Sequence, residues 1–283
     1  MSADGADLRI CVVSGADEIR LRSYINHTIY CRTHDLDYRL DCTLTEGVKD
    51  KFLLKQAAVL RLLPHYDWVA WVDDDCYITD FDRDNFRRYA REAEAAGKFH
   101  VIARGVEEPQ GFWSYVNAGV FMVKSCPTGF DFLQDIMAGD PQTVVDWWDA
   151  EKFGMCNGGY DQDVMTWLMA TKDYGQGTLW ADHREWNSRY HYYTDSLKDA
   201  FICHFAGFPD KKMGVVGFAN RYGVGQELVP EELLDRFHVT VRSPMGRAEQ
   251  RARMRVWQTR GQLKPYLKPI RDRYRAYRSE GRG

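Results

Sequence analysis

Residues 68–75 read WVAWVDDD, five apolar residues followed directly by the aspartates Asp73, Asp74 and Asp75. A continuous apolar run of this length is typical of a strand that is covered on both faces. Three adjacent carboxylates repel one another unless a cation or solvent relieves the repulsion. The stretch therefore predicts a buried strand with a cation site at its carboxyl end. The alternative is a solvated acidic turn that caps the next element.

The residues before this strand alternate between strand and helix patterns. Residues 8–14 and 36–42 have the spacing of strands, whereas residues 22–34 and 51–63 have helical spacing, the second helix being ended by Pro64. This order predicts an α/β fold with a mixed, mostly parallel sheet flanked by helices, which binds its ligand at the carboxyl ends of strands. Because no GxGxxG or Walker pattern follows a strand, the sequence argues against dinucleotide-dependent dehydrogenases and P-loop enzymes.

The residues after this strand continue the α/β pattern less regularly. Residues 115–124 (YVNAGVFMVK) predict another core strand, and residues 160–171 predict a helix. Residues 175–223 are rich in Gly, aromatic residues and Asp, so we expect ordered loops that line a site. The tail predicts a helical extension with a break around Pro265 and Pro269.

Charge divides the chain into two parts. Residues 242–283 hold 13 Lys/Arg against 3 Asp/Glu, and residues 1–241 hold 25 against 38. We therefore expect a catalytic domain over 1–241 and a basic helical C-terminal extension over 242–283. The acidic domain argues against nucleic-acid binding, which relies on clustered cations.

Cellular location is approached through the termini and the cysteines. The first ten residues lack the zones of a signal peptide, and no apolar run approaches the roughly 20 residues of a membrane span. The seven cysteines are scattered and never in CxxC spacing, which argues against a zinc ribbon or a disulfide framework. We expect a cytoplasmic protein.

Several polar residues stand where they need a ligand or a local explanation. Asp73 and Asp75 suit Mn²⁺ or Mg²⁺, which prefer oxygen ligands and leave positions open for substrate phosphates. His204, in the strand-like run FICHFAGF, is either a buried core residue or a metal ligand. Asn117 and Gly119 interrupt an apolar strand, where both are costly unless they contact a ligand or form a local bond.

Four segments in this order, WVAWVDDDCYITDF, VNAGVFMVK, YDQDV and HFAGFPDKK, make residues 8–212 resemble the retaining GT-A (Rossmann-like) glycosyltransferases of families 8 and 34. The resemblance implies that Asp73, Asp75 and His204 bind Mn²⁺ (or Mg²⁺), which in turn holds the diphosphate of a UDP-sugar donor. It also implies that Asp74 faces the ribose or the sugar of this donor.

The resemblance assigns the reacting centre as well. Asn117 and Ala118 match a segment that contacts hydroxyls of the donor sugar. Asp161 matches a sugar-binding aspartate and Gln162 a residue near the anomeric carbon, with Asp163 as a second candidate nucleophile or a positioning group; without the resemblance, such acids are ordinary partners of a helix dipole. Retention requires either a carboxylate nucleophile or same-face attack, and because Gln is a poor nucleophile the second route is favoured.

Other donor contacts follow the same pattern with departures. The family 8 pattern HFxGxxKPW is broken here because an aspartate occupies the lysine position, so Lys211, or the lysine after it, is expected to neutralise the diphosphate. Gly207 lets the backbone approach a phosphate closely. Lys55 matches a family cation near the donor or is a solvated helical lysine. Asp17 contacts the nucleotide base or is an ordinary turn residue.

The acceptor side is less specific. The residues that suit stacking on sugar faces are Trp147, Trp148, Trp180, Trp186 and the cluster RYHYY. Because aromatic residues are more often core, one or two are expected to contact a glycan or glycolipid acceptor in polysaccharide biosynthesis. The segment ending in Asn187 is similar to a WN segment that supports the site in these families. The basic tail either contacts the inner face of a membrane peripherally or packs on the acidic domain.

Two rival functions stay open. An inverting GT-A transferase would need an acidic general base near the acceptor. A catalytically silent carbohydrate-binding or scaffold protein would keep the fold without the reaction. A nucleotidyltransferase also uses clustered aspartates but does not predict the NAG and DQD segments.

Overall fold

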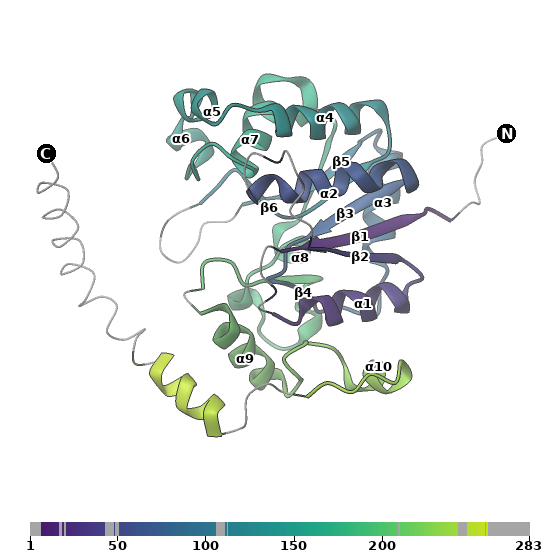
Figure 1. Ribbon diagram of the computed structural model, residues 1–283, viewed down its shortest axis with the longest axis vertical. Helices are drawn as coiled ribbons and strands as arrows, with labels where there is room; N and C mark the ends of the chain where they lie inside the picture. The colour runs from purple at the N-terminus through teal and green to yellow at the C-terminus, as the bar shows by residue number, and fades with distance from the viewer. Residues whose placement is uncertain are drawn as a thin grey trace, which may run out of the picture.

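The structure is a computed structural model, and it describes residues 7–16, 19, 21–42, 48, 51–105, 111, 113–208, 210–242, 248–257 and 259. Figure 1 shows a central sheet with helices on both sides. The strands are β1 Ile10–Gly15, β2 Asp37–Asp41, β3 Trp68–Val72, β4 Cys76–Ile78, β5 His100–Arg104, β6 Val116–Lys124, β7 Thr178–Ala181 and β8 Ile202–His204. The helices are α1 Ser23–Thr33, α2 Leu54–Leu62, α3 Asn85–Ala95, α4 Pro127–Ala138, α5 Pro141–Trp147, α6 Ala150–Phe153, α7 Gln162–Thr171, α8 His183–Trp186, α9 Lys211–Tyr222 and α10 Glu231–Arg236.

The main sheet has the strand order β2-β1-β3-β6-β5-β7. The pairs β1–β2, β1–β3 and β5–β7 are parallel, and β6 runs antiparallel to both β3 and β5. The predicted fold class, a mixed and mostly parallel sheet flanked by helices, is therefore confirmed. Strand β3 lies inside the sheet with every residue buried, as its unbroken apolar run predicts.

Each face of the sheet has its own core. On one face Val13, Val69 and Phe121 pack with α2, α4 and α7, the helices above the sheet in Figure 1. On the other face Val12, Ala70 and other residues pack with α1 and α3. Strand β3 is thus packed on both faces, which fixes the position of Asp73 directly after its carboxyl end.

A second, two-stranded sheet continues from this carboxyl end. Strands β4 and β8 are antiparallel, and Cys76 lies opposite His204 in their register. The pairing joins residues that are more than a hundred positions apart in the chain, and a third core, which includes Tyr77, Phe205 and Phe218 of α9, packs beside it. The small sheet is what brings His204 next to the acidic residues after β3.

One expectation needs correction. Residues 175–223 are not mainly loops, because β7, α8, β8 and α9 lie within them. Helix α9 contains two glycines, and their low helix propensity weakens the helical signal in its sequence. Gly214 is required by packing, since a Cβ there would lie 2.8 Å from the Phe208 ring.

The basic extension is described only in part. Residues 248–257 are helical, as predicted, and the stacked rings of Phe208 and Trp257, 6.4 Å apart, connect this helix (yellow in Figure 1) to the body. Pro265 and Pro269 lie outside the described residues. Among the described residues, no helix has the length and apolar character needed to cross a bilayer.

Candidate active site

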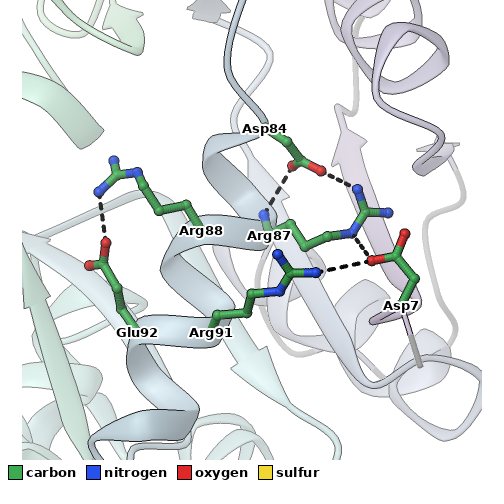
Figure 2. A pocket seen from close by; sticks show the side chains of 6 residues that line it. All are labelled: Asp7, Asp84, Arg87, Arg88, Arg91 and Glu92. Atoms are coloured by element: carbon green, nitrogen blue, oxygen red, sulfur yellow. Dashed lines mark hydrogen bonds and ion pairs between the residues drawn. The ribbon is translucent and has the colours of Figure 1, made fainter. Parts of the chain in front are cut away.

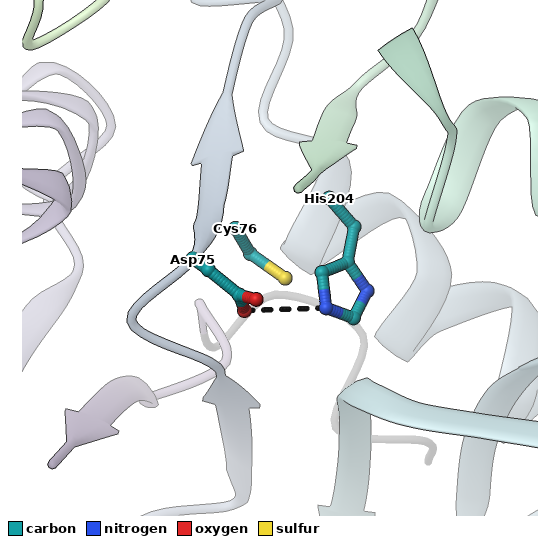
Figure 3. A group of neighbouring side chains, drawn as sticks. All are labelled: Asp75, Cys76 and His204. Atoms are coloured by element: carbon teal, nitrogen blue, oxygen red, sulfur yellow. Dashed lines mark ion pairs between the residues drawn. The ribbon is translucent and has the colours of Figure 1, made fainter. Parts of the chain in front are cut away.

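Six of the predicted site residues form two charged groups, one around Asp75 and one around Asp73. The first group joins Asp75, His204 and Lys211. His204 Nε2 lies 3.2 Å from Asp75 Oδ1, and Lys211 Nζ lies 2.6 Å from Asp75 Oδ2. Figure 3 shows the carboxylate and the imidazole pointing at one another beside the Cys76 thiol. The distant segments 73–75 and 202–204 therefore converge, as the sequence predicts.

Contacts on the far side of the His204 ring fix its orientation. Asn187 Nδ2 donates to the backbone oxygen and to Oδ1 of Asn117, at 3.2 and 2.9 Å. The Oδ1 of Asn187 must then face His204 Nδ1, 2.9 Å away, and accept its proton. In the neutral ring, Nε2 therefore directs its lone pair at a carboxylate oxygen. Two acceptors in this position need a shared proton or a cation between them.

The side chains around Asp75 suit a cation that prefers oxygen and nitrogen ligands. Within the described chain, ligand atoms of Asp75, Cys76 and His204 all lie within 4.8 Å of one another. Burial raises the pKa of the Cys76 thiol well above its usual range. Its sulfur is also a soft ligand, whereas Mn²⁺ and Mg²⁺ prefer oxygen. His204 and Asp75 fit Mn²⁺ or Mg²⁺. Burial opposes ionisation of Asp75, but Lys211 and the protonated form of His204 outweigh burial, so the pKa of Asp75 is lowered.

The second group joins Lys55, Asp73 and Asp161. Lys55 Nζ lies 2.8 Å from Asp161 Oδ2 and 3.3 Å from Asp73 Oδ1. Burial alone would lower the pKa of this ammonium, but Asp161 and Asp73 outweigh burial and the pKa is raised. Lys55 is therefore not a solvated helical lysine, because it is buried and shared by two carboxylates. Asp73 belongs to this group here, and its role as a metal ligand stays a prediction.

A bulge in β6 holds the two groups together. The pairing of β5 with β6 jumps from Ile102↔Phe121 to Ala103↔Asn117, so the residues between 117 and 121 leave the ladder with β5. In this segment the Gly119 carbonyl accepts from Asp73 N at 2.8 Å, and the Ala118 carbonyl accepts from Lys55 Nζ at 3.3 Å. The bulge thus fixes both Asp73 and Lys55.

Gly119 is also required by the His204 ring. A Cβ at this position would overlap His204 Cε1 and would lie 2.8 Å from Nδ1. Asn117 Oδ1 closes the bulge by accepting from Gly119 N at 3.0 Å. The local-bond explanation for Asn117 is therefore satisfied, while the side chain stays only half-buried.

The loop before α7 is ordered by Asp163. Its Oδ2 accepts from Asn157 N at 2.6 Å and from Gly159 N at 3.0 Å. This arrangement favours the positioning role over the nucleophile role. Asp161, which follows this loop, has a left-handed φ of 46°, an uncommon conformation for a residue with a side chain. Gln56 Nε2 donates to its Oδ1 at 2.7 Å.

Three other predicted residues lie close in the chain to members of these two groups. Gln162 is the first residue of α7 and is half-buried. Asp74 is half-buried, and its carbonyl accepts from Ser23 Oγ at 2.5 Å. Gly207 has a left-handed φ of 75° with open space where a Cβ would be. Asp17 lies outside the described residues.

Sequence reasoning missed two contributors. Gln56 lies in the middle of α2, where a polar helical residue gives no signal. Trp71 Nε1 donates to Asp73 Oδ1 at 2.6 Å, although the apolar run marks it only as core. Both orient acidic side chains that were predicted.

A charged hollow of about 490 Å³ lies elsewhere, over α3. Figure 2 shows that its arginines and acids pair with one another, Arg87 with Asp7 and Asp84, Arg91 with Asp7, and Arg88 with Glu92. These internal pairs explain the hollow without a ligand.

Comparison with known proteins adds named relatives. No family model matches the chain. The chain is 24% identical over 181 residues to galactomannan galactosyltransferase 1 of Cyamopsis tetragonoloba, covering 59% of this chain and 40% of that protein. It is 26% identical over 211 residues to probable glycosyltransferase 7 of Oryza sativa subsp. indica, covering 67% and 45%. The chain thus spans less than half the length of these curated relatives.

Solved structures are more distant. A glycosyltransferase involved in the glycosylation of the major capsid of PBCV-1 shares 15% identity with a TM-score of 0.47, covering 71% of this chain and 96% of that one. Mouse xyloside xylosyltransferase 1 shares 14% identity with a TM-score of 0.41, covering 71% and 98%.

Proposed function

We propose that this chain is a metal-dependent glycosyltransferase of the GT-A type, which moves a sugar from a UDP-sugar donor to a hydroxyl of a glycan or glycolipid. The observation that carries the proposal is the approach of His204 Nε2 to Asp75 Oδ1, 3.2 Å apart, with the opposite nitrogen of the ring held by Asn187. The names of the sequence relatives support a sugar transfer in particular.

Asp75 and His204 would hold Mn²⁺ or Mg²⁺, joined by Asp73 if its carboxylate turns from Lys55 toward the ion. When bound, such an ion neutralises the departing diphosphate. Lys211 projects from the first turn of α9 with its ammonium on Asp75, and nearby Asp74 and Asp73 also help raise the pKa of Lys211 against the effect of burial. This lysine therefore stays charged and adds a second cation for the diphosphate.

Asp161 and Gln162 serve the donor sugar in this proposal. Lys55 and Gln56 hold the Asp161 carboxylate from two sides, at 2.8 and 2.7 Å, in a strained backbone position. A side chain fixed in this way can accept hydrogen bonds from sugar hydroxyls without further ordering. Asp163 accepts hydrogen bonds from backbone N–H groups of the preceding loop and is thereby a positioning residue. In this proposal Gln162, a poor nucleophile, lies beside the reacting centre, which favours same-face attack with retention.

The test combines binding and turnover. We expect Mn²⁺ with at least one UDP-sugar to raise the melting temperature of the native chain, because a ligand that binds only the folded state stabilises it. Asp75→Asn and His204→Ala should lose this shift, whereas the control variant Asp84→Asn, at the half-buried N-cap of α3, should keep it. NMR of the product anomer separates retention from inversion. Absence of UDP release from every UDP-sugar tested with Mn²⁺ would leave the silent carbohydrate-binding alternative.

A further inference from the structure

An exposed arginine at the carboxyl end of β5 contacts two aromatic rings. Arg104 is the last residue of β5, and its guanidinium carbon lies 3.5 Å from the ring centroid of Trp180 and 3.9 Å from that of Tyr115. The two rings meet edge to face at 5.7 Å and 87°, so the guanidinium occupies the corner between them. Contacts with two rings hold a flexible side chain in one place.

No ion pair of Arg104 exists within the part of the chain that the structure describes. Arg87 and Arg88, by contrast, both pair with carboxylates. A guanidinium that is fixed by rings keeps its N–H donors available, and its planar fork matches a carboxylate or a phosphate. Arg104 is exposed, so a ligand can reach these donors.

A second cation lies along the same aromatic surface. Tyr115 contacts Phe153 with ring centroids 5.3 Å apart, and Lys152 Nζ lies 5.1 Å from the Phe153 centroid. The neighbouring Asp149 directs a carboxylate oxygen to the backbone N–H groups that begin α6, at 3.0 and 3.3 Å, which lowers its competition for these cations.

This surface adjoins the proposed donor site on the side away from Asp73. Arg104 pairs with Val116 and Ala103 with Asn117 in the register of β5 and β6, and Trp180 lies one strand further on β7. Tyr115 N donates to the Phe153 carbonyl at 2.9 Å, and the chain after Phe153 leads to the loop that carries Asp161. The proposed donor residues therefore follow β3 or lie on β6, and the arginine ends the neighbouring strand β5.

We propose that Arg104 binds an acidic group, a carboxylate or a phosphate, on the acceptor glycan, with Lys152 as a second, weaker cation. The identification of the bound glycan as the acceptor rests on the proposed function. The binding of an acidic saccharide does not depend on the donor chemistry. It makes the acceptor an anionic glycan rather than a neutral one. On a domain with a negative formal charge, such a preference needs a fixed cation of this kind.

The test measures affinity without nucleotide or metal. Calorimetry compares trigalacturonic acid with its carboxyl-reduced neutral counterpart, and galactose 6-phosphate with galactose, on the full chain. We expect the native protein to bind at least one acidic probe about tenfold more tightly than its neutral counterpart, as charge-assisted hydrogen bonds predict. The two acidic probes distinguish a carboxylate from a phosphate ligand.

Variants assign the preference to this residue. Arg104→Gln should abolish it, Arg104→Lys should keep a reduced preference, and Arg236→Gln should change nothing. Arg236 is the matched control because it is exposed and lies 5.4 Å from the Phe237 ring, on α10. Equal affinity for acidic and neutral probes, or an unchanged preference in Arg104→Gln, would overturn the proposal. Missing UDP release by the native chain would instead contradict the proposed function, which is measured separately.

Discussion

At the His204 ring, single contacts decide which nitrogen can serve a cation. Asn187 Oδ1 accepts the hydrogen bond from Nδ1, because the amide nitrogen of Asn187 already donates to Asn117. The other ring nitrogen, Nε2, therefore faces Asp75. Sequence patterns suggest a histidine ligand only through the order of motifs, since a lone histidine in an apolar strand is more often a core residue. The tautomer depends on a contact across seventeen residues, which no local pattern contains.

Gly119 gives a residue-scale prediction. Gly119→Ala places a methyl group against His204 Cε1, so the ring must turn away from Asp75. We expect loss of the Mn²⁺-dependent thermal shift and a destabilisation of about 1–3 kcal/mol from overpacking. The matched control is Gly217→Ala in α9, where the new Cβ would meet Met254 Cε at an ordinary 3.5 Å. A normal metal response in Gly119→Ala would separate this glycine from the site.

His27 gives a prediction for pH dependence. This buried ring contacts Ser14 Oγ through Nδ1 and the Cys76 carbonyl through Nε2, and burial lowers its pKa from 6.5 to about 4. Between these two pH values the unfolded chain binds the proton more readily, so the stability contributed by the neutral ring is lost as pH falls below 6.5. From pH 7 to pH 5 the loss from His27 is about 2 kcal/mol.

Urea unfolding at both pH values measures this effect. His27→Gln should remove about 2 kcal/mol of the pH-dependent loss, while His65→Gln, at an exposed histidine, should leave the dependence as it is. A native-like pH dependence in His27→Gln would show that other groups cause the acid sensitivity.

At the scale of elements, the sequence predicts the main-sheet strands β1, β2, β3 and β6 but misses β5 and β7, and it does not predict how the strands are joined. The apolar runs of β1, β3 and β6 identify them, because burial on both faces needs such runs. The antiparallel direction of β6 and its bulge have no signature of their own, since side-chain periodicity is the same in both directions. Helix α9 was missed because Gly214 and Gly217 have low helix propensity; Gly214 is required by packing against Phe208.

The loop before α7 gives an element-scale prediction. Asp163→Ala leaves the N–H groups of Asn157 and Gly159 without their acceptor, which costs about 2 kcal/mol or more and displaces Asp161. We expect turnover to fall strongly, while UDP affinity is retained because Asp75, His204 and Lys211 are untouched. Asp163→Asn keeps an acceptor oxygen and should retain most activity. If Asp163→Asn is as inactive as Asp163→Ala, this residue acts as the nucleophile.

At the scale of the whole molecule, the charge of the extension and its contacts both favour a helix that packs on the body and exposes cations. Residues 1–241 are acidic and residues 242–283 are basic. The described helix of the extension contacts the body through Trp257 on Phe208 and Met254 near Gly217, while Arg251 and Arg255 stay exposed. Composition predicts this charge division, but the contact with Phe208, next to Gly207 of the proposed diphosphate loop, needs the folded chain. The helix thus contacts the body at one face and exposes Arg251 and Arg255, whereas its Arg253 pairs with Glu249.

The extension gives the last prediction, that it holds the enzyme on an anionic membrane. Basic residues near such a surface contribute about 1 kcal/mol each at moderate salt, an attraction that salt weakens. We expect the full chain to pellet with vesicles of phosphatidylcholine and phosphatidylserine but not with phosphatidylcholine alone. A chain ending at Arg242 should stay in solution, and Arg251→Gln with Arg255→Gln, in the full chain, should pellet less. Thermal unfolding must first show that both variants are folded. Equal pelleting of the full and shortened chains would mean that the extension packs only on the acidic domain, because its cations would then contribute nothing to membrane binding.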